Sequence, residues 1–206
     1  MGRDKATMLL DGKPLIAHVF DAAKNVFADI MVVSSLHTAF DGVKAPVIKD
    51  VLPVSGALTG IVSALIASDT EYVFVLGCDM PFVTAEAMRY VVDAAAGEDI
   101  IMPRTEAGLE PMHALYHRSC ISPMLTAIGR GSMKIAGLVR GRMKIADVFA
   151  MVQVKVLSPD PVFFNRGVSV FTNINTEEDL LRAEGLVRRG GDQGDAGSGP
   201  RRGACD

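Results

Sequence analysis

Tyr72-Val-Phe-Val-Leu-Gly-Cys-Asp-Met-Pro-Phe82 is an apolar run that ends on a carboxylate. Its β-branched and aromatic residues are typical of a strand buried on both faces of a parallel sheet. Pro81 stops that strand, so Asp79 lies just beyond its carboxyl end, where ligands bind in open α/β sheets. A carboxylate in this position is a natural ligand for Mg²⁺ that carries nucleotide phosphates. The alternative is that Asp79 caps the next helix, but Thr84 with Glu86 supplies a better cap.

Composition limits the classes of protein to consider. The chain has 206 residues, of which 49% are hydrophobic and 22% charged, which describes one globular domain with a full core. The net charge of -3 gives no footprint for nucleic acid. No apolar stretch approaches the ~18 residues needed to span a bilayer, and the first residues are too polar for a secretory signal. We therefore expect a cytoplasmic protein that binds neither nucleic acid nor membrane.

The order of the expected elements predicts an α/β fold with a mostly parallel sheet and helices on both of its faces. Residues 1–187 form the predicted domain, and the Gly-, Asp- and Arg-rich stretch 188–206 is expected to be a disordered tail. Strands are expected over residues 6–10, 29–34, 43–49, 73–76, 99–102, 114–116, 152–157 and 168–171, and helices over 15–26, 61–67, 84–92, 119–128, 134–139 and from 176 onward.

Three charged residues, Lys5, Asp50 and Asp79, stand at expected strand ends or in adjoining loops. A lysine holds phosphate as a point charge, and a carboxylate holds the Mg²⁺ that bridges phosphate oxygens. The glycines around Gly56 lie at a loop-to-helix junction, where the backbone can approach a ligand. The set suits transfer of a nucleotide between phosphates, which needs positioning and charge neutralisation but no nucleophilic side chain. Three unrelated surface charges are the simpler alternative.

A larger set of motifs resembles the molybdenum cofactor guanylyltransferases, which belong to the nucleotidyltransferases with a three-layer Rossmann-like fold. The resemblance covers roughly residues 1–183. It rests on Met1-Gly-x-Asp-Lys5, Gly12-Lys-Pro-Leu15, Val32-Val-Ser34, Asp50, Gly56-Ala-Leu-Thr-Gly60, Cys78-Asp-Met-Pro81, Glu110-Pro-Met-His-Ala-Leu-Tyr116 and Asn173-Ile-Asn-Thr176. The resemblance implies transfer of GMP from Mg·GTP to the terminal phosphate of molybdopterin, with Mg²⁺ as the cofactor and with transient contacts to proteins that donate or accept the cofactor.

Site residues follow from the same resemblance. Lys5 contacts the GTP phosphates, and Asp79 binds Mg²⁺ and the nucleotide, which makes these two the expected catalytic pair. Asp50 and Gly56 belong to the guanosine site, with Ser34 near the nucleotide.

The resemblance also places residues on the acceptor side of the site. Asn173 and Asn175 match an Asn-x-Asn element on the pterin side, although two asparagines before a helix cap are equally expected in a plain strand end. Lys134 falls near a basic position for the molybdopterin phosphate, and His113 either approaches the site or packs within a strand.

The largest departure is at the start, where family members carry a first strand and a glycine-rich loop around the triphosphate. Either the true start lies upstream or the chain is truncated. Without that strand, its neighbours are expected to expose apolar edges and unpaired backbone groups. We therefore predict that this chain alone is poorly soluble and nearly inactive. Two other readings remain: a nucleotidyltransferase for another substrate, such as a CTP-dependent cofactor cytidylyltransferase, and a non-catalytic nucleotide-binding or partner-binding module.

Overall fold

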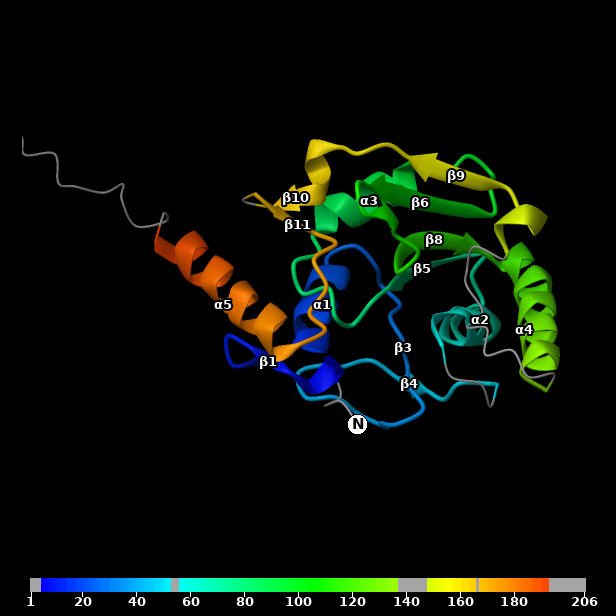
Figure 1. The fold of residues 1–206 in the computed structure, drawn as a ribbon, viewed down its shortest axis with the longest axis horizontal. Coiled ribbons are helices and arrows are strands. Elements are labelled where there is room, and N and C mark those ends of the chain that lie inside the picture. The colour runs from blue at the N-terminus through cyan, green and yellow to red at the C-terminus, as the bar shows by residue number, and fades with distance from the viewer. Residues whose placement is uncertain (1–4, 53–55, 137–147, 166, 193–206) are drawn as a thin grey trace, which may run out of the picture.

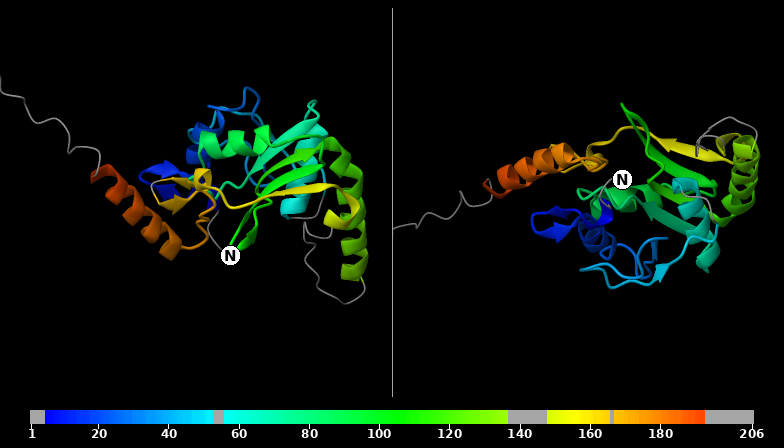
Figure 2. Two further views of the ribbon diagram at one scale, coloured as in Figure 1. Left: turned by 90° about the horizontal axis from the view of Figure 1, so that it is seen from above. Right: turned by 60° about the horizontal axis from the view of Figure 1, so that its bottom comes forward.

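The fold has three layers, with a mixed sheet between two pairs of helices (Figures 1 and 2). The structure is a computed structural model and describes residues 5–52, 56–136, 148–165 and 167–192, without the side chains of 131–136 and 189–192. The predicted α/β class is confirmed. In the described part of the chain, no helix is long and apolar enough to cross a membrane.

The central sheet has five strands in the order β5-β8-β6-β7, with β9 paired to β6. These are β5 (Tyr72–Leu76), β6 (Ile100–Thr105), β7 (Gly108–Leu109), β8 (His113–His117) and β9 (Val154–Leu157). β8 is antiparallel to both β5 and β6, and β7 is antiparallel to β6, whereas β9 runs parallel to β6. The expectation of a mostly parallel sheet is therefore wrong for these strands, because the short β6–β7 hairpin returns the chain as an antiparallel neighbour.

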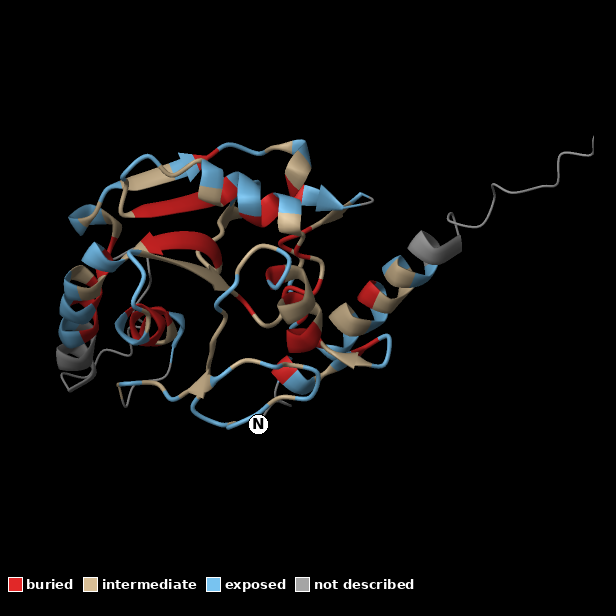
Figure 3. Ribbon diagram, turned by 180° about the vertical axis from the view of Figure 1, so that it is seen from behind, coloured by how far each residue is buried: buried red, intermediate tan, exposed pale blue. Residues whose placement is uncertain are grey.

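Each face of the sheet packs on its own pair of helices. α2 (Ala57–Ala67) and α4 (Ile121–Ala136) cover one face, where Ile100 and Tyr116 are fully buried. α1 (Leu15–Ala23) and α3 (Ala85–Asp93) cover the other, where Ile101 and Leu115 lie in the core. Successive residues of β6 and β8 therefore point to opposite faces and are buried on both, and Figure 3 shows buried residues concentrated on these two strands.

The first elements stand apart from the main sheet. Residues Lys5–Thr7 form a 3-10 helix, and β1 (Leu9–Leu10) pairs with β2 (Lys13–Pro14) in an antiparallel hairpin. The expected strand over residues 6–10 is therefore wrong except at its end, because the turn at Asp11 and Gly12 returns the chain at once. The strands expected at 29–34 and 43–49 are reduced to β3 (Val32–Val33) and β4 (Val47–Ile48), a parallel pair outside the five-stranded sheet.

One edge of β5 has no partner. The Gly77 N–H donates to the Met112 carbonyl, so alternation directs the N–H and C=O groups of Phe74 and Leu76 away from β8. Among the described residues no strand pairs with that edge, and all five residues of β5 are only partly buried. The expectation that this strand is buried on both faces is therefore wrong. Its unpaired edge agrees with the separate expectation of exposed apolar edges and unpaired backbone groups. The poor solubility and inactivity stay predictions.

The later elements differ from expectation mainly in their limits. α4 continues through Gly129 to Ala136 as one helix where two were expected, because a glycine inside a helix weakens it without ending it. Residues 137–139 of the second expected helix lie outside the described residues. α5 (Glu177–Asp192) includes residues 188–192, so the predicted disordered tail begins too early. The rest of that predicted tail, residues 193–206, lies outside the described residues. β10 (Phe164–Asn165) and β11 (Val168–Ser169) form a hairpin, and short 3-10 helices occupy Arg118–Cys120, Phe149–Met151 and Pro161–Phe163.

Candidate active site

Lys5, Asp79 and Asn175 meet just beyond the carboxyl end of β5. The Lys5 Nζ lies 4.0 Å from the Asp79 Oδ2 and donates a hydrogen bond to the Asn175 Oδ1. The Asp79 carbonyl accepts from the Ile174 N–H at 2.9 Å, which fastens the Asn-x-Asn segment to this strand end. The structure thus brings together a cation, a carboxylate and an amide that are far apart in sequence.

The Asp79 side chain is partly exposed and does not cap α3. Thr84 is the N-cap of α3, because its Oγ1 accepts from the Ala87 N–H at 3.2 Å. A Cβ at Gly77 would come within 2.8 Å of the Asp79 Oδ1, so only glycine leaves the carboxylate in this orientation. Sequence reasoning used Gly77 only as the end of a strand and missed this role.

The Asn-x-Asn segment is fixed by the start of α5. The Asp179 side chain accepts from the backbone N–H groups of Asn175 and Thr176, each at 3.0 Å, while the Thr176 Oγ1 accepts from the Asp179 N–H. These bonds hold the pKa of Asp179 below its usual range, and the hydrogen bond with the Thr176 side chain has the largest effect. Asn173 is exposed and Asn175 contacts Lys5, so only Asn175 joins the catalytic group through a described contact.

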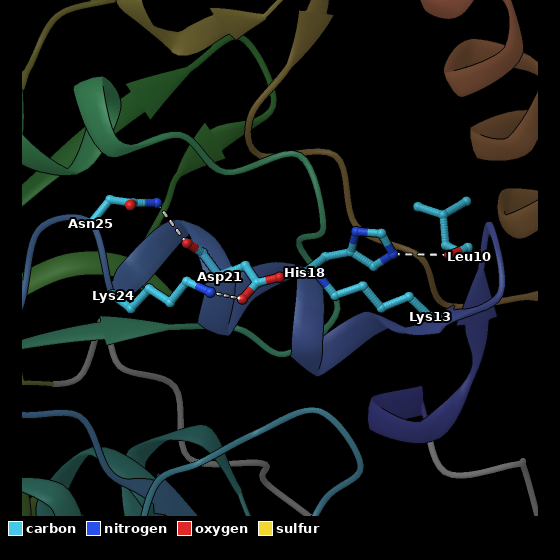
Figure 4. A network of polar contacts seen from close by, with 6 residues as sticks. All are labelled: Leu10, Lys13, His18, Asp21, Lys24 and Asn25. Atoms are coloured by element: carbon cyan, nitrogen blue, oxygen red, sulfur yellow. Dashed lines mark hydrogen bonds and ion pairs between the residues drawn. The ribbon is translucent and has the colours of Figure 1, made fainter.

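A clamp on α1 holds the hairpin that follows Lys5 (Figure 4). The Asp21 carboxylate pairs with both Lys13 on β2 and Lys24. Both contacts lower the pKa of Asp21, and the contact with Lys13 has the larger effect. The His18 Nε2 lies 2.9 Å from the Leu10 carbonyl on β1. His18 is therefore a structural residue, and the clamp ties the β1–β2 hairpin to α1.

Asp50 belongs to a second group of polar residues, at the end of β4. The Ser35 hydroxyl donates to the Asp50 Oδ2 at 2.6 Å, and the Ser63 Oγ lies 3.2 Å from the Asp50 Oδ1. Gly56 is the N-cap of α2 and carries no side chain, so it cannot cap the first N–H groups of that helix through a side-chain hydrogen bond. Ser35 and Ser63 were missed, because their relation to Asp50 follows only from the folded arrangement.

The remaining candidates have other surroundings. The Ser34 Oγ accepts from the N–H groups of Leu36 and His37, so it stabilises a local turn. His113 is fully buried between the rings of Phe74 and Phe171, which supports packing within the strand. The side chain of Lys134 lies outside the described part of α4.

The donor chemistry at β5 fits Mg²⁺. The Asp79 carboxylate and the Asn175 amide supply hard oxygen atoms, which Mg²⁺ binds together with water and substrate phosphates. Within the described residues, no group of three or more His, Cys, Asp or Glu side chains forms a fuller metal site. A single carboxylate is the donor set expected where the substrate supplies most of the ligands.

Comparisons with known proteins identify the family of the chain. The model of the MobA-like NTP transferase domain matches residues 1–145. The molybdenum cofactor guanylyltransferase of Desulfosudis oleivorans is 28% identical over 92% of this chain and 90% of its own, and a probable molybdenum cofactor guanylyltransferase of Natranaerobius thermophilus is 30% identical over 89% and 88%.

Solved structures give the same result. The molybdopterin-guanine dinucleotide biosynthesis protein A of Archaeoglobus fulgidus superposes with a TM-score of 0.73 at 26% identity, covering 91% of this chain and 92% of that one. A Thermus thermophilus 2-C-methyl-D-erythritol 4-phosphate cytidylyltransferase shares the fold, with a TM-score of 0.60 at 18% identity over 89% and 94%. The resemblance found in the sequence is confirmed: the chain belongs to the MobA-like NTP transferase domain family and is a nucleotidyltransferase.

Proposed function

We propose that the protein transfers GMP from GTP to the terminal phosphate of molybdopterin and releases pyrophosphate. A phosphate oxygen of the acceptor attacks the α-phosphorus of GTP, and the bond from that phosphorus to the bridging oxygen of the β-phosphate breaks. One phosphorus–oxygen bond forms as one is lost, so no covalent enzyme intermediate is needed. The names of the relatives support guanylyl transfer to the molybdenum cofactor.

The contact between Lys5 and Asp79 is the observation that carries this proposal. Their atoms lie 4.0 Å apart, and both side chains are partly exposed, at 45% and 24%. Lys5 faces the triphosphate and offsets the charge that develops on the leaving pyrophosphate. Asn175 orients the Lys5 ammonium group through its amide oxygen. These residues position the phosphates and stabilise charge, which is most of what this reaction requires.

Mg²⁺ is the proposed cofactor, with Asp79 as its protein ligand. When bound, it neutralises phosphate charge and orients the α-phosphate for attack. The guanosine part of GTP is assigned to the side of Asp50, where the uncapped start of α2 at Gly56 offers N–H donors. Asp50 keeps its orientation through Ser35 and Ser63, so its carboxylate meets the nucleotide in a fixed position.

Isothermal calorimetry with GTP, CTP and ATP in the presence of Mg²⁺ tests the proposal. It is applied to the 206-residue chain, to a form extended at its N-terminus by a strand and a glycine-rich loop, and to Asp79→Ala in each. We expect the extended form to bind GTP selectively, in a manner that needs Mg²⁺ and is lost in Asp79→Ala, and the 206-residue chain to bind it only weakly. Preference for CTP would instead assign a cytidylyltransferase, and absence of nucleotide binding in both forms would favour the non-catalytic module.

The matched control is Asp29→Ala, which removes an exposed carboxylate outside both polar groups. It should leave GTP binding unchanged, which separates the role of Asp79 from a change in net charge. A cytoplasmic location, and transient contacts with proteins that supply or receive the cofactor, remain part of the proposal.

A further inference from the structure

Glu110 is a half-buried carboxylate at the same sheet edge as Asp79. It lies between β7 and β8, and its backbone N–H donates to the Pro103 carbonyl of β6 at 3.0 Å. The hydrogen bond from Gly77 to Met112 joins the ends of β5 and β8. Asp79 follows Gly77 by two residues, beyond the end of β5. Glu110 precedes Met112 by two residues, before the start of β8. Both carboxylates therefore extend from the same end of this strand pair.

The carboxylate of Glu110 has an unused hydrogen-bonding capacity. The Thr105 hydroxyl donates to the Oε1 at 3.0 Å. Among the described residues no Lys, Arg or His forms an ion pair with it, and burial raises the pKa of Glu110, an effect that the Thr105 bond only partly opposes. The Glu110 Oε2 is therefore available to accept a hydrogen bond from a ligand. The described side chains supply no hydrogen-bond donor to this oxygen.

The position of Glu110 points to the acceptor and away from the nucleotide base. The β3–β4 pair, which delivers Asp50, lies on the β5 side of the sheet (Figure 1), while Glu110 precedes β8, the strand that pairs with the other edge of β5. Asp79 follows β5, between these two carboxylates. The reacting phosphates occupy the middle of the bound pair of substrates, so a base near Asp50 leaves the region of Glu110 to the acceptor. This step rests on the proposed function.

We propose that Glu110 is a specificity-determining residue that binds the N–H donors of the acceptor's pterin ring. A pterin presents a 2-amino group beside a ring N–H, and this pair of donors matches the two oxygens of a carboxylate. Thr105 fixes one oxygen of Glu110 and thereby limits rotation of the carboxylate. Asn173 is exposed and precedes Ile174, whose N–H donates to the Asp79 carbonyl, so it is available as a second polar group for the acceptor.

Titration with pterin and lumazine tests the assignment, because lumazine carries an oxygen where pterin carries the 2-amino group. Both probes are added with GTP and Mg²⁺ at saturation, so that the nucleotide site is filled, and binding is followed by probe fluorescence. We expect the unchanged protein to prefer pterin by about tenfold or more, the usual effect of a hydrogen bond to a charged group. Glu110→Gln should lose most of that preference, with GTP affinity and thermal unfolding unchanged.

Thr105→Val is the matched variant, since it removes the hydroxyl but keeps the shape and the Glu110 charge. It should weaken pterin binding less than Glu110→Gln does. An equal preference of the unchanged protein for the two probes, or a preference retained in Glu110→Gln, would overturn the inference while leaving GTP binding intact. A loss of GTP binding in Glu110→Gln would overturn it too, by assigning Glu110 to the nucleotide. Failure of both the 206-residue chain and its N-terminally extended form to bind GTP would instead count against the proposed function.

Discussion

Burial of His113 makes the stability of this protein depend on pH. The side chain is fully buried, and the centroid of its ring lies 5.2 Å from those of the Phe74 and Phe171 rings. Burial lowers the pKa of His113 from 6.5 to about 4. The Ala87 backbone opposes this shift only in part, and it does not make a regular hydrogen bond with either ring nitrogen. The folded protein therefore holds this histidine neutral.

The sign and size of the effect follow from that shift. Above pH 6.5 the histidine is neutral in both states and contributes no pH dependence. As the pH falls from 6.5 towards 4, the unfolded chain takes up a proton that the folded chain rejects, so the free energy of unfolding decreases. The loss is about 2 kcal/mol between pH 7 and pH 5, and about 3 kcal/mol by pH 4.

Urea denaturation at pH 7, 6 and 5, followed by circular dichroism, measures this loss. His113→Leu should be close to neutral at pH 7, because no hydrogen bond is lost, and should remove most of the decrease at pH 5. His117→Leu is the matched control at the other end of β8, where the ring packs on Tyr72 and meets the Ser119 hydroxyl, and it should keep the decrease. A wild-type free energy that stays constant from pH 7 to 5, or the same decrease in His113→Leu, would refute the reasoning.

Three further substitutions test the supports of the site. Thr84→Ala removes the N-cap of α3 and should cost about 1 kcal/mol in urea denaturation, whereas Thr126→Ala, whose hydroxyl bonds within its own helix, should cost less. Ser63→Ala leaves the Val51 N–H without its partner and frees Asp50, so we expect about 1 kcal/mol of destabilisation and weaker GTP binding by calorimetry. Asp21→Asn should cost less than about 1 kcal/mol, because its ion pairs are exposed, but should speed hydrogen exchange across residues 9–14.

Local signals predicted the elements around Asp79. The β-branched run before it gave β5, and the threonine followed by acidic residues gave the N-cap of α3. The strand-then-break pattern placed Asp79 beyond a strand end, where Lys5 meets it. These inferences succeeded because each depends on a few neighbouring residues whose preferences agree with the fold.

Features that depend on tertiary contacts could not be predicted in this way. The apolar run Ala114-Leu-Tyr116 predicts a strand but carries no information on its direction, so the antiparallel place of β8 between β5 and β6 was missed. In the sequence, Ser63 is one serine within a predicted helix, and only the folded structure shows its contact with Asp50. Asn175 joins Lys5 across 170 residues of sequence, and only the family resemblance drew attention to it. In each case the deciding contact is long-range.

The loose pairing of Lys5 with Asp79 fits the chemistry better than a tight salt bridge would. At 4.0 Å and with 45% of the lysine side chain exposed, the pair contributes no more than about 1 kcal/mol. A triphosphate and its metal can therefore enter between the two groups at little cost, each group turning from its partner to the substrate. Other contacts set the orientation that must survive this separation: Asn175 for Lys5, and Gly77 and the Ile174 bond for Asp79. Rigid supports around a weak central pair let the substrate displace the pair without unfolding the site.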